Sequence, residues 1–297
     1  MFSILIPTYN TEIVNLVDDL YSQCRNLNID FEILCYDDGS LAKYKEVNRK
    51  VIEYKRVIYK EMKMNLGRAK IRNTLAKDAA FDKLLFLDAD SGIIREDFIF
   101  TYIKQMNNDV IYGGRLYQEN KPANKAKILH WKYGREKESQ HVEIRKKNPY
   151  LSFLSNNFVI DKRKFDQIKF DEQHSGYGYE DTLFAVELKK NNIEIMHIDN
   201  PVMHLNLEDA DVFIRKTAEA MKNLSDLYTQ KKIIDTKLIK TYKKLDRFGL
   251  AGLFGRIVLG LKKPILANLY SSKPDLLLFQ MYKLAIFIKF QCDDYHK

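Results

Sequence analysis

The chain lacks several features that would assign it to common protein classes. Its three cysteines have neither the spacing of a disulfide framework nor that of a metal site, a usage typical of a reducing compartment. No uninterrupted apolar stretch is long enough to cross a bilayer. The first residues lack the basic segment and the small-residue cleavage site of a signal peptide. We therefore expect a cytoplasmic protein.

Acidic residues are scarce in the C-terminal segment. Residues 211–297 contain 17 Lys+Arg but only 8 Asp+Glu, whereas the 210 residues before them contain 32 of each. The net charge of +9 therefore belongs to that segment. With 297 residues, 45% of them hydrophobic, the chain is long enough for one large domain and an appendage. We predict a main domain over residues 1–210 and a basic, helical extension over residues 211–297.

Short apolar runs alternate with amphipathic segments near the start of the chain. The runs are Phe2–Ile6, Phe31–Tyr36, Arg56–Tyr59 and Leu84–Leu87. Strand–helix units of about 25–30 residues are typical of parallel sheets with right-handed crossovers. The sequence therefore predicts an α/β fold with a mostly parallel sheet flanked by helices.

Two carboxylates follow the last of these runs. In an extended segment Asp88 and Asp90 point the same way, because side chains alternate along a strand. Carboxylate oxygens at the carboxyl end of a buried strand suit a divalent cation such as Mg²⁺ or Mn²⁺, and open α/β sheets bind ligands at this edge. The alternative is a helix-capping aspartate beside a solvated one. The neighbouring motifs favour the metal site.

Other polar groups are predicted at the same edge of the sheet. Thr8–Asn10 and Asp37–Asp38 each end a predicted strand, and Arg68 and Arg72 lie four residues apart in the first turns of a helix. Free N–H groups and the dipole of that helix end favour anions. Together with the carboxylates, these groups describe a site for a metal-bound nucleoside diphosphate. Alternatively, the arginines lie on a solvated face and the acidic pair only forms a turn.

Four motifs, in order and at about the usual spacing, resemble glycosyltransferase family 2, whose members have the GT-A fold. They are Ser3–Asn10, Asp37–Ser40, Asn65–Asn73 and Leu87–Asp90, and the resemblance covers roughly residues 2–206. It implies that Asp88-Ala89-Asp90 holds Mn²⁺ or Mg²⁺ on the pyrophosphate of the donor. It also implies a nucleotide site made of the first loop, the acidic pair and the arginine of the Arg-Asn motif, namely Pro7, Thr8, Tyr9, Asn10, Asp37, Asp38 and Arg72.

A second pair of carboxylates follows a glycine pattern further along the chain. Gly176 and Gly178 allow a tight turn, after which Glu180 and Asp181 open a helix. A carboxylate there gains from the helix dipole and could simply cap the helix. The chemical alternative is a general base that takes the proton of the acceptor hydroxyl. The pattern resembles the acceptor-side motif of galactosyl- and N-acetylgalactosaminyl-transferring members. We predict Asp181 as the base, with Glu180 as the alternative base or an acceptor-binding group.

Two histidines lie in the β-like run Ile193–His204. A lone histidine at a strand end is more often structural than functional. In relatives with the same Glu-Asp pattern, a histidine shortly downstream completes the metal shell, and His204 matches that position better than His197. A neutral imidazole suits Mn²⁺ better than Mg²⁺. We predict His204 as a metal ligand beside Asp88 and Asp90.

Two apolar segments of the extension are bordered by basic residues. Residues 248–261 and 276–290 are each too short to span a bilayer comfortably, but their composition fits helices on an anionic membrane surface. We therefore expect peripheral membrane association through residues 247–290. The alternative is a helical appendage that packs on the main domain or on a second copy of the chain, as a homo-oligomer.

These features predict a metal-dependent glycosyltransferase with a nucleotide-sugar donor, and UDP is the expected nucleotide. The resemblance implies inversion at the anomeric carbon. The expected acceptor is a growing glycan or a lipid-linked oligosaccharide of a bacterial surface polysaccharide. Residues 115–150 are polar and without periodicity, so we expect an irregular segment near that acceptor.

Three other functions are less consistent with the sequence. A sugar nucleotidyltransferase usually carries a glycine-rich signature after its first strand, and Pro7–Thr11 contains no glycine. A nucleic-acid binder spreads its basic residues along a groove with stacking aromatics, whereas these lysines border apolar helices. A catalytically silent relative that only binds glycan or nucleotide would not need Asp88, Asp90 and Asp181 together.

Overall fold

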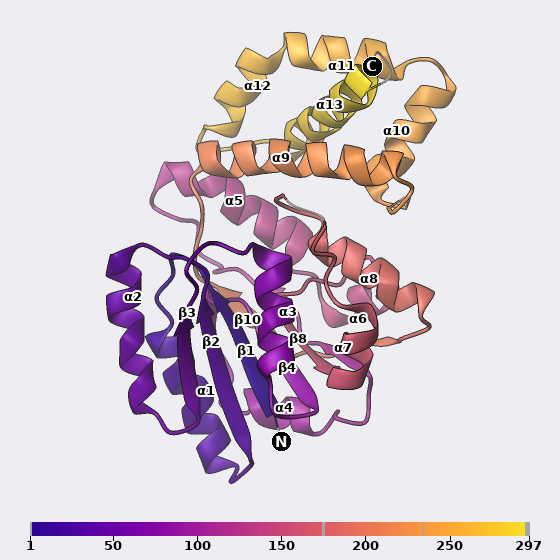
Figure 1. Cartoon of the computed structure of the whole chain (residues 1–297). Helices are drawn as coiled ribbons and strands as arrows, with labels where there is room; N and C mark the ends of the chain where they lie inside the picture. Colours follow the sequence, from indigo (N-terminus) through magenta and orange to yellow (C-terminus); the bar gives the residue numbers. More distant parts are fainter. Residues whose placement is uncertain (1, 174–175, 234, 295–297) are drawn as a thin grey trace. The chain divides into compact units, whose positions relative to one another are not determined.

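The structure, a computed structural model, describes residues 2–173, 176–233 and 235–294 (Figure 1). The chain forms two compact units. The first, which holds the central sheet, consists of Met1–Tyr117, Glu138–Ser175 and Glu180–Asn206. The second, which is helical, consists of Gln118–Lys137, Gly176–Tyr179 and Leu207–Lys297. Two short internal segments therefore belong with the C-terminal helices, a grouping that the sequence pattern did not indicate.

A seven-stranded sheet forms the centre of the first unit, in the order β3-β2-β1-β4-β8-β6-β9. Its strands are β1 (Phe2–Thr8), β2 (Phe31–Asp37), β3 (Val57–Glu61), β4 (Lys83–Leu87), β6 (Val110–Tyr112), β8 (Asn157–Asp161) and β9 (Ile195–His197). β8 runs antiparallel to both of its neighbours, and the other pairings of the described sheet are parallel. The register pairs Thr8 with Asp37, so the first loop and the acidic pair lie side by side. The predicted α/β fold is confirmed.

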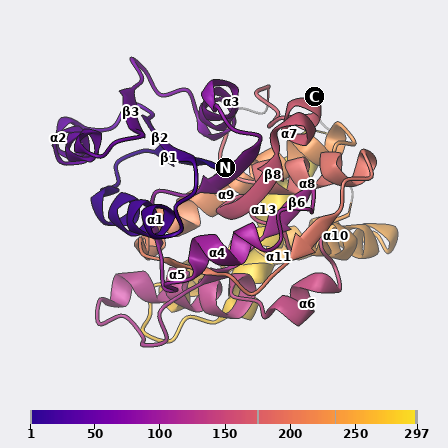
Figure 2. The ribbon, with the colours of Figure 1, turned by 90° about the horizontal axis from the view of Figure 1, so that it is seen from below.

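Helices cover both faces of this sheet (Figure 2). They are α1 (Val14–Asn26) and α4 (Phe98–Ile103) on one face, and α3 (Arg68–Asp78), α7 (Lys162–Ile168) and α8 (Glu180–Lys190) on the other. Ile4 and Ile6 join the core under α1, whereas Leu5 joins the core under α3. Because both faces of the strand are buried, its sequence is continuously apolar rather than alternating.

A second, three-stranded sheet completes the carboxyl edge. It contains β5 (Ser91–Gly92), β10 (Val202–His204) and β7 (Arg115–Leu116), with β10 in the middle. His204 pairs with Ser91, and the backbone N–H of Leu205 donates to the carbonyl of Asp90 at 2.9 Å. Met203 pairs with Leu116 on the other side. This small sheet brings two distant segments of the chain, β7 and β10, to the end of β4, which β5 directly follows.

Residues 115–150 are not irregular, so that expectation is wrong. After β7 they form short helices, namely η2 (Lys125–Lys127), α5 (Ile128–Tyr133), the π-helix η3 (Gly134–Glu138) and α6 (Val142–Lys146). η2 and α5 belong to the second unit, whereas α6 and the short helices α2 (Ala42–Asn48) and η1 (Arg49–Glu53) belong to the first. π-Helices are rare and occur frequently at functional sites. Here the π-helix ends at Glu138, a residue of the candidate site.

The second unit packs its helices around α13. It contains α9 (Ala210–Thr229), α10 (Lys237–Arg247), α11 (Ala251–Gly260), α12 (Lys262–Leu269) and α13 (Leu276–Asp294). α13 buries Phe279 and Phe287 completely, and their rings contact aromatic side chains of α9 and α10. The apolar segment 276–290 is therefore the core of this unit and is not a membrane-facing helix. No helix in the described part of the chain is both long and apolar enough to cross a membrane.

Candidate functional site

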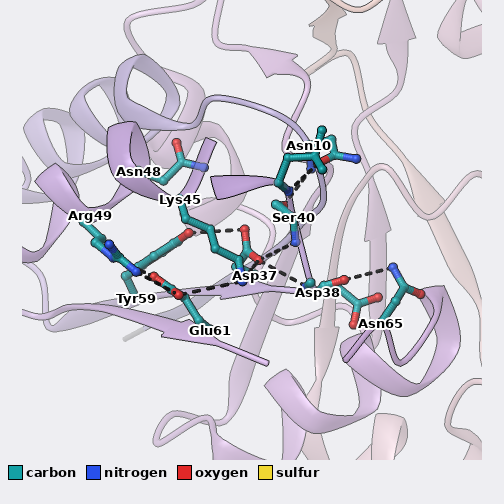
Figure 3. Close-up of polar contacts among 12 residues, drawn as sticks. Asn10, Asp37, Asp38, Ser40, Lys45, Asn48, Arg49, Tyr59, Glu61 and Asn65 are labelled. Atoms are coloured by element: carbon teal, nitrogen blue, oxygen red, sulfur yellow. Dashed lines mark hydrogen bonds and ion pairs between the residues drawn. The ribbon is translucent and has the colours of Figure 1, made fainter. Parts of the chain in front are cut away.

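Asp37 organises the loop that follows β2 (Figure 3). Its Oδ1 accepts from the backbone N–H groups of Gly39 at 3.1 Å and Ser40 at 2.8 Å, and its Oδ2 accepts from the hydroxyl of Tyr59 at 3.2 Å. Gly39 has φ +82°, a conformation that favours glycine. The side chain of Asp37 is fully buried. This arrangement corresponds to the turn-forming alternative for Asp37.

The first loop is tied to the same turn (Figure 3). The backbone N–H of Asn10 donates to Ser40 Oγ at 2.8 Å, and Asn10 Oδ1 accepts from the N–H of Leu41 at 2.8 Å. Pro7 and Thr8 end β1, and Thr8 is buried. Tyr9, in contrast, is 54% exposed and is the most exposed residue of this loop.

Asp38 anchors the start of α3. Its Oδ1 and Oδ2 accept from the N–H groups of Leu66 at 2.6 Å and Gly67 at 3.0 Å. Asn65 donates to the backbone carbonyl of Asp38 at 2.9 Å. Burial and the charge of Asp37 raise the pKa of Asp38, although the two N–H groups oppose this shift. The Asp38 carboxylate thus fixes the helix end from which Arg68 and Arg72 project.

Asp88 lies between two arginines. Arg72 donates from Nη2 to Asp88 Oδ1 at 2.7 Å, and Arg115 donates from Nη2 to Oδ2 at 3.1 Å. Arg115 also donates to Glu138 Oε2 at 3.2 Å, which accepts from the hydroxyl of Tyr117 as well. Sequence reasoning missed Arg115, Tyr117 and Glu138. The sequence contained no signal for them, because only the small sheet places β7 beside the end of β4.

Asp90 and His204 face each other across the small sheet. Asp90 Oδ2 lies 3.4 Å from His204 Nδ1. Although burial opposes it, the hydrogen bond and charge of His204 and the charges of Arg115 and Arg68 lower the pKa of Asp90 to about 2. The carboxylate is therefore ionised at neutral pH. Ala89, between the two aspartates, is buried, and its methyl side chain cannot bind a metal ion.

His197 occupies a different environment. Its Nδ1 lies 3.2 Å from Nη1 of Arg145, and its Nε2 lies 3.0 Å from the carbonyl of Pro149. Burial, together with the charge of Arg145, lowers the pKa of His197 to about 4, so the imidazole is neutral. Both ring nitrogens thus have protein partners. Of the two histidines, only His204 is close to the aspartates of the site.

The Glu-Asp pair opens α8, as predicted, and the other arginine of α3 reaches it. Arg68 donates from Nη1 to Glu180 Oε1 at 2.8 Å. Although burial opposes it, the charges of Arg68 and Arg72 lower the pKa of Glu180. Ser155 donates to Asp181 Oδ1 at 2.5 Å. Burial and the charge of Glu180 raise the pKa of Asp181 to about 6, although Arg72 and Ser155 act in the other direction.

The two arginines of α3 therefore connect the two acidic motifs. Arg72 binds the first motif at Asp88, and Arg68, one helical turn earlier, binds the second motif at Glu180. Asp181 is close enough to Asp88 for its pKa to respond to that charge. The sequence-predicted carboxylates from residues 88–90 and 180–181 thus belong to one electrostatic cluster.

Part of this chain matches the model of a known protein family. The model of glycosyl transferase family 2 matches residues 3–174, which is more than half of the chain. The chain belongs to glycosyl transferase family 2. Comparison with curated proteins gives no match.

Solved structures share the fold of this family 2 chain. TarS 1–349 from S. aureus aligns with a TM-score of 0.50 and 16% identity, over 99% of this chain and 91% of that one. The same protein in complex with UDP-GlcNAc gives 0.51 and 17%, over 99% and 91%. The mannosyltransferase PcManGT from Pyrobaculum calidifontis, in complex with GDP-Man and Mn²⁺, gives 0.61 and 13%, over 99% and 87%. These likenesses confirm the expected GT-A fold class.

The donor atoms of the family 2 site fit a divalent cation only in part. Asp90 and His204 supply a carboxylate and an imidazole side by side, a pair suited to Mn²⁺. The oxygens of Asp88 instead accept from Arg72 and Arg115. Within the described residues, no three His, Cys, Asp or Glu side chains form a group that could hold a metal alone. The set therefore suits a cation that diphosphate oxygens also coordinate.

The glycine pattern before Glu180 has a packing origin. Gly176 and Gly178 have φ values of +144° and +90°. A Cβ on Gly176 would lie 2.4 Å from Asn223 Nδ2, and one on Gly178 would lie 2.7 Å from the Cβ of Ala220. Asn223 donates to the carbonyl of Tyr177 at 2.8 Å. Only glycine lets this loop approach α9 so closely before the chain enters α8.

Variants of the two histidines should separate structural from ligand roles. We expect His197→Gln to lower the free energy of unfolding by about 2 kcal/mol, because it removes a buried imidazole that contacts Arg145 and the carbonyl of Pro149. We expect His204→Gln to weaken Mn²⁺-dependent nucleotide binding about tenfold or more, because it removes the imidazole beside Asp90. Chemical denaturation and calorimetric titration of both variants measure the two effects. Equal nucleotide affinity in the two variants would contradict the assignment of His204.

Proposed function

We propose that this family 2 protein is an inverting, metal-dependent glycosyltransferase that moves a sugar from a UDP-linked donor to an acceptor hydroxyl. The observation that carries the proposal is the pair of arginines on α3, which joins the Asp88–Asp90 motif to the Glu180–Asp181 motif. Donor binding and proton removal require these two groups of carboxylates close together. The UDP-GlcNAc complex of TarS and the GDP-Man and Mn²⁺ complex of PcManGT support this class of donor.

In the donor site, each group of residues has a distinct proposed role. Tyr9 and the loop Pro7–Asn10 contact the nucleoside, while Asp37 and Asp38 hold that loop and the start of α3 in shape. Arg68 and Arg72 attract the diphosphate at the helix end. Asp90 and His204, with Asp88, would hold the cation, which offsets the charge that builds on the departing diphosphate. Asp88 would have to give up a contact with Arg72 or Arg115 to bind the cation, because both of its oxygens accept from these arginines.

At the acceptor side, Asp181 is the proposed general base. Its raised pKa keeps it able to take a proton at physiological pH, and the hydroxyl of Ser155 holds Oδ1 in place. Glu180, paired with Arg68, stays ionised and contributes the negative charge that raises the pKa of Asp181. In the proposed step, the acceptor hydroxyl gives its proton to Asp181 while its oxygen bonds to the anomeric carbon. The bond from that carbon to the diphosphate breaks, and the nucleoside diphosphate leaves from the opposite face.

The acceptor we propose is a glycan or a lipid-linked oligosaccharide of a bacterial surface polysaccharide, presented at the cytoplasmic face of the membrane. The basic C-terminal unit supports an acceptor held near an anionic surface. A catalytically silent relative is disfavoured by Asp181, because a buried carboxylate with a raised pKa reduces stability at neutral pH and is typical of active sites.

The pH dependence of transfer should report Asp181. A general base must be deprotonated, so we expect kcat/KM to fall tenfold per pH unit below about 6, in the range where Asp181 takes up its proton. Above that value the profile is expected to be flat until another group titrates. Initial rates from pH 5 to 8, at saturating metal, measure the profile. A flat profile down to pH 5 would exclude Asp181 as the base.

A donor screen tests the function itself. The protein is incubated with UDP-linked hexoses and N-acetylhexosamines and with GDP-mannose, with Mn²⁺ or with a chelator, and nucleotide release is measured. We expect release of UDP from one donor, loss of that release in the chelator, and an inverted anomeric configuration in the transferred sugar. Release of pyrophosphate from a nucleoside triphosphate would instead identify a nucleotidyltransferase. Binding without turnover for every donor and acceptor would support the silent relative.

A further inference from the structure

One face of α11 carries large apolar side chains that the second unit does not bury. α11 lies beside α13 (Figure 1). It packs there through Ala251, Gly255 and Val258, and a Cβ on Gly255 would lie 3.1 Å from Ile288. The exposed apolar side chains near and along its other face are Phe248 (66% exposed), Leu250 (47%), Leu253 (51%), Ile257 (54%) and Leu261 (53%). We call these five residues the α11 face. Residues 250, 253 and 257 follow helical spacing, so they form one continuous strip.

The surroundings of the α11 face are basic and contain no carboxylate from the same stretch. Residues 247–274 contain no Asp or Glu. The same stretch contains five basic residues, Arg247, Arg256, Lys262, Lys263 and Lys273. Each of these five is exposed. An apolar strip with a mostly basic border is therefore built into the surface of the second unit, with Asp246 and Asp275 as the carboxylates that directly flank the stretch.

We propose that the α11 face docks on an anionic lipid surface. Its leucine, isoleucine and phenylalanine side chains enter the boundary between headgroups and acyl chains, while the bordering arginines and lysines meet the lipid phosphates. α13 holds α11 from behind through buried side chains, so the strip is presented as a preformed surface. The proposal rests on the C-terminal unit and is independent of the proposed donor chemistry.

A second copy of the chain fits the α11 face less well than lipid does. In a two-fold dimer the same patch meets itself. The exposed Arg247, Arg256, Lys262 and Lys263 of one copy would then approach those of the other, and the two flanking carboxylates, Asp246 and Asp275, are too few to compensate their charge. Such like-charge contacts oppose association. Anionic headgroups, in contrast, neutralise the border while the acyl region accepts the strip.

Vesicle sedimentation with the full-length chain tests the proposal without any nucleotide. Vesicles of phosphatidylcholine mixed with phosphatidylglycerol are compared with vesicles of phosphatidylcholine alone. We expect about tenfold or stronger binding to the anionic vesicles, and weaker binding as salt is raised. Absence of binding to the anionic vesicles overturns the proposal, and equal binding to both kinds overturns the role of the basic border.

Two pairs of variants locate the surface. We expect Leu253→Ser with Ile257→Ser to reduce vesicle binding about tenfold or more, because two exposed side chains lose their apolar contact. The matched control is Ile52→Ser with Ile144→Ser, two isoleucines of the first unit that are 62% and 55% exposed, and it should bind as the parent does. Lys262→Gln with Lys263→Gln should reduce binding to anionic vesicles only, whereas Lys43→Gln with Lys50→Gln should not.

Two further outcomes would overturn the assignment of the α11 face to lipid. Equal vesicle binding by the Leu253/Ile257 variant and its control places the membrane contact elsewhere and overturns the proposal. Sedimentation equilibrium without vesicles measures self-association of the same proteins. If the parent chain is a dimer and only the Leu253/Ile257 variant is a monomer, the face binds a second copy. The thermal unfolding midpoints of all four variants should match the parent, since every substituted side chain is exposed.

Discussion

Asp181→Asn is expected to lower the rate of sugar transfer by about a hundred- to ten-thousandfold, the usual contribution of a positioned general base. The same substitution is expected to stabilise the protein at pH 8 by about 1–2 kcal/mol, because folding raises the pKa of Asp181 above its unfolded value. A carboxyl group with a raised pKa contributes stability below pH 4, and this contribution is lost as pH rises to about 6. Asn keeps the contact with Ser155 and removes the charge. Single-turnover rates and denaturant unfolding at pH 8 measure the two effects.

Asp166→Asn is the matched control for this prediction. Asp166 is an exposed aspartate on α7, so the same chemical change there should alter neither the transfer rate nor the stability. Glu180→Gln tests the alternative base. If Glu180→Gln abolishes transfer while Asp181→Asn leaves it intact, the roles of the two carboxylates are reversed. A loss of both activity and stability in Asp181→Asn would contradict this prediction, because removing the buried charge of Asp181 at pH 8 should stabilise the folded state.

The parts of the site that depend on local sequence were predictable. Asp88 and Asp90 follow a strand whose apolar run is visible in the sequence, and the edge of a parallel sheet brings such strand ends together. Arg68 and Arg72 lie on one side of α3 because of helical spacing alone. Their two partners could not be read from the sequence, however, since Asp88 and Glu180 reach α3 only through tertiary packing.

The parts that depend on long-range pairing were not predictable. Arg115 meets Asp88 because β7 joins a small sheet with β5 and β10, and a lone arginine after two glycines has no distinguishing pattern. Similarly, residues 276–290 have the composition of an interfacial helix, but α9 and α11 cover them. An apolar segment buries itself wherever a partner exists, so composition alone cannot tell a core helix from a surface helix.

Asp90→Asn is expected to weaken Mn²⁺-dependent UDP binding about a hundredfold. The wild-type carboxylate is ionised and lies beside the imidazole of His204, so it supplies charge that an amide cannot. A weaker, metal-independent affinity should survive in the variant, because Arg68 and Arg72 still attract the diphosphate. Calorimetric titration of UDP, with Mn²⁺ and with a chelator, measures both components.

Asp97→Asn provides the control for the metal prediction, because Asp97 pairs with Arg95 on the surface and lies outside the site. Its UDP affinity should equal that of the wild type under both conditions. If wild-type affinity is the same with Mn²⁺ and with the chelator, the cation does not take part in donor binding and Asp90 serves only to hold His204. If GDP binds with Mn²⁺ and UDP does not, the metal site stands and the nucleoside assignment changes. The cation and the base are thus separable by two substitutions, because Asp90 lies beside His204 whereas Asp181 accepts from Ser155.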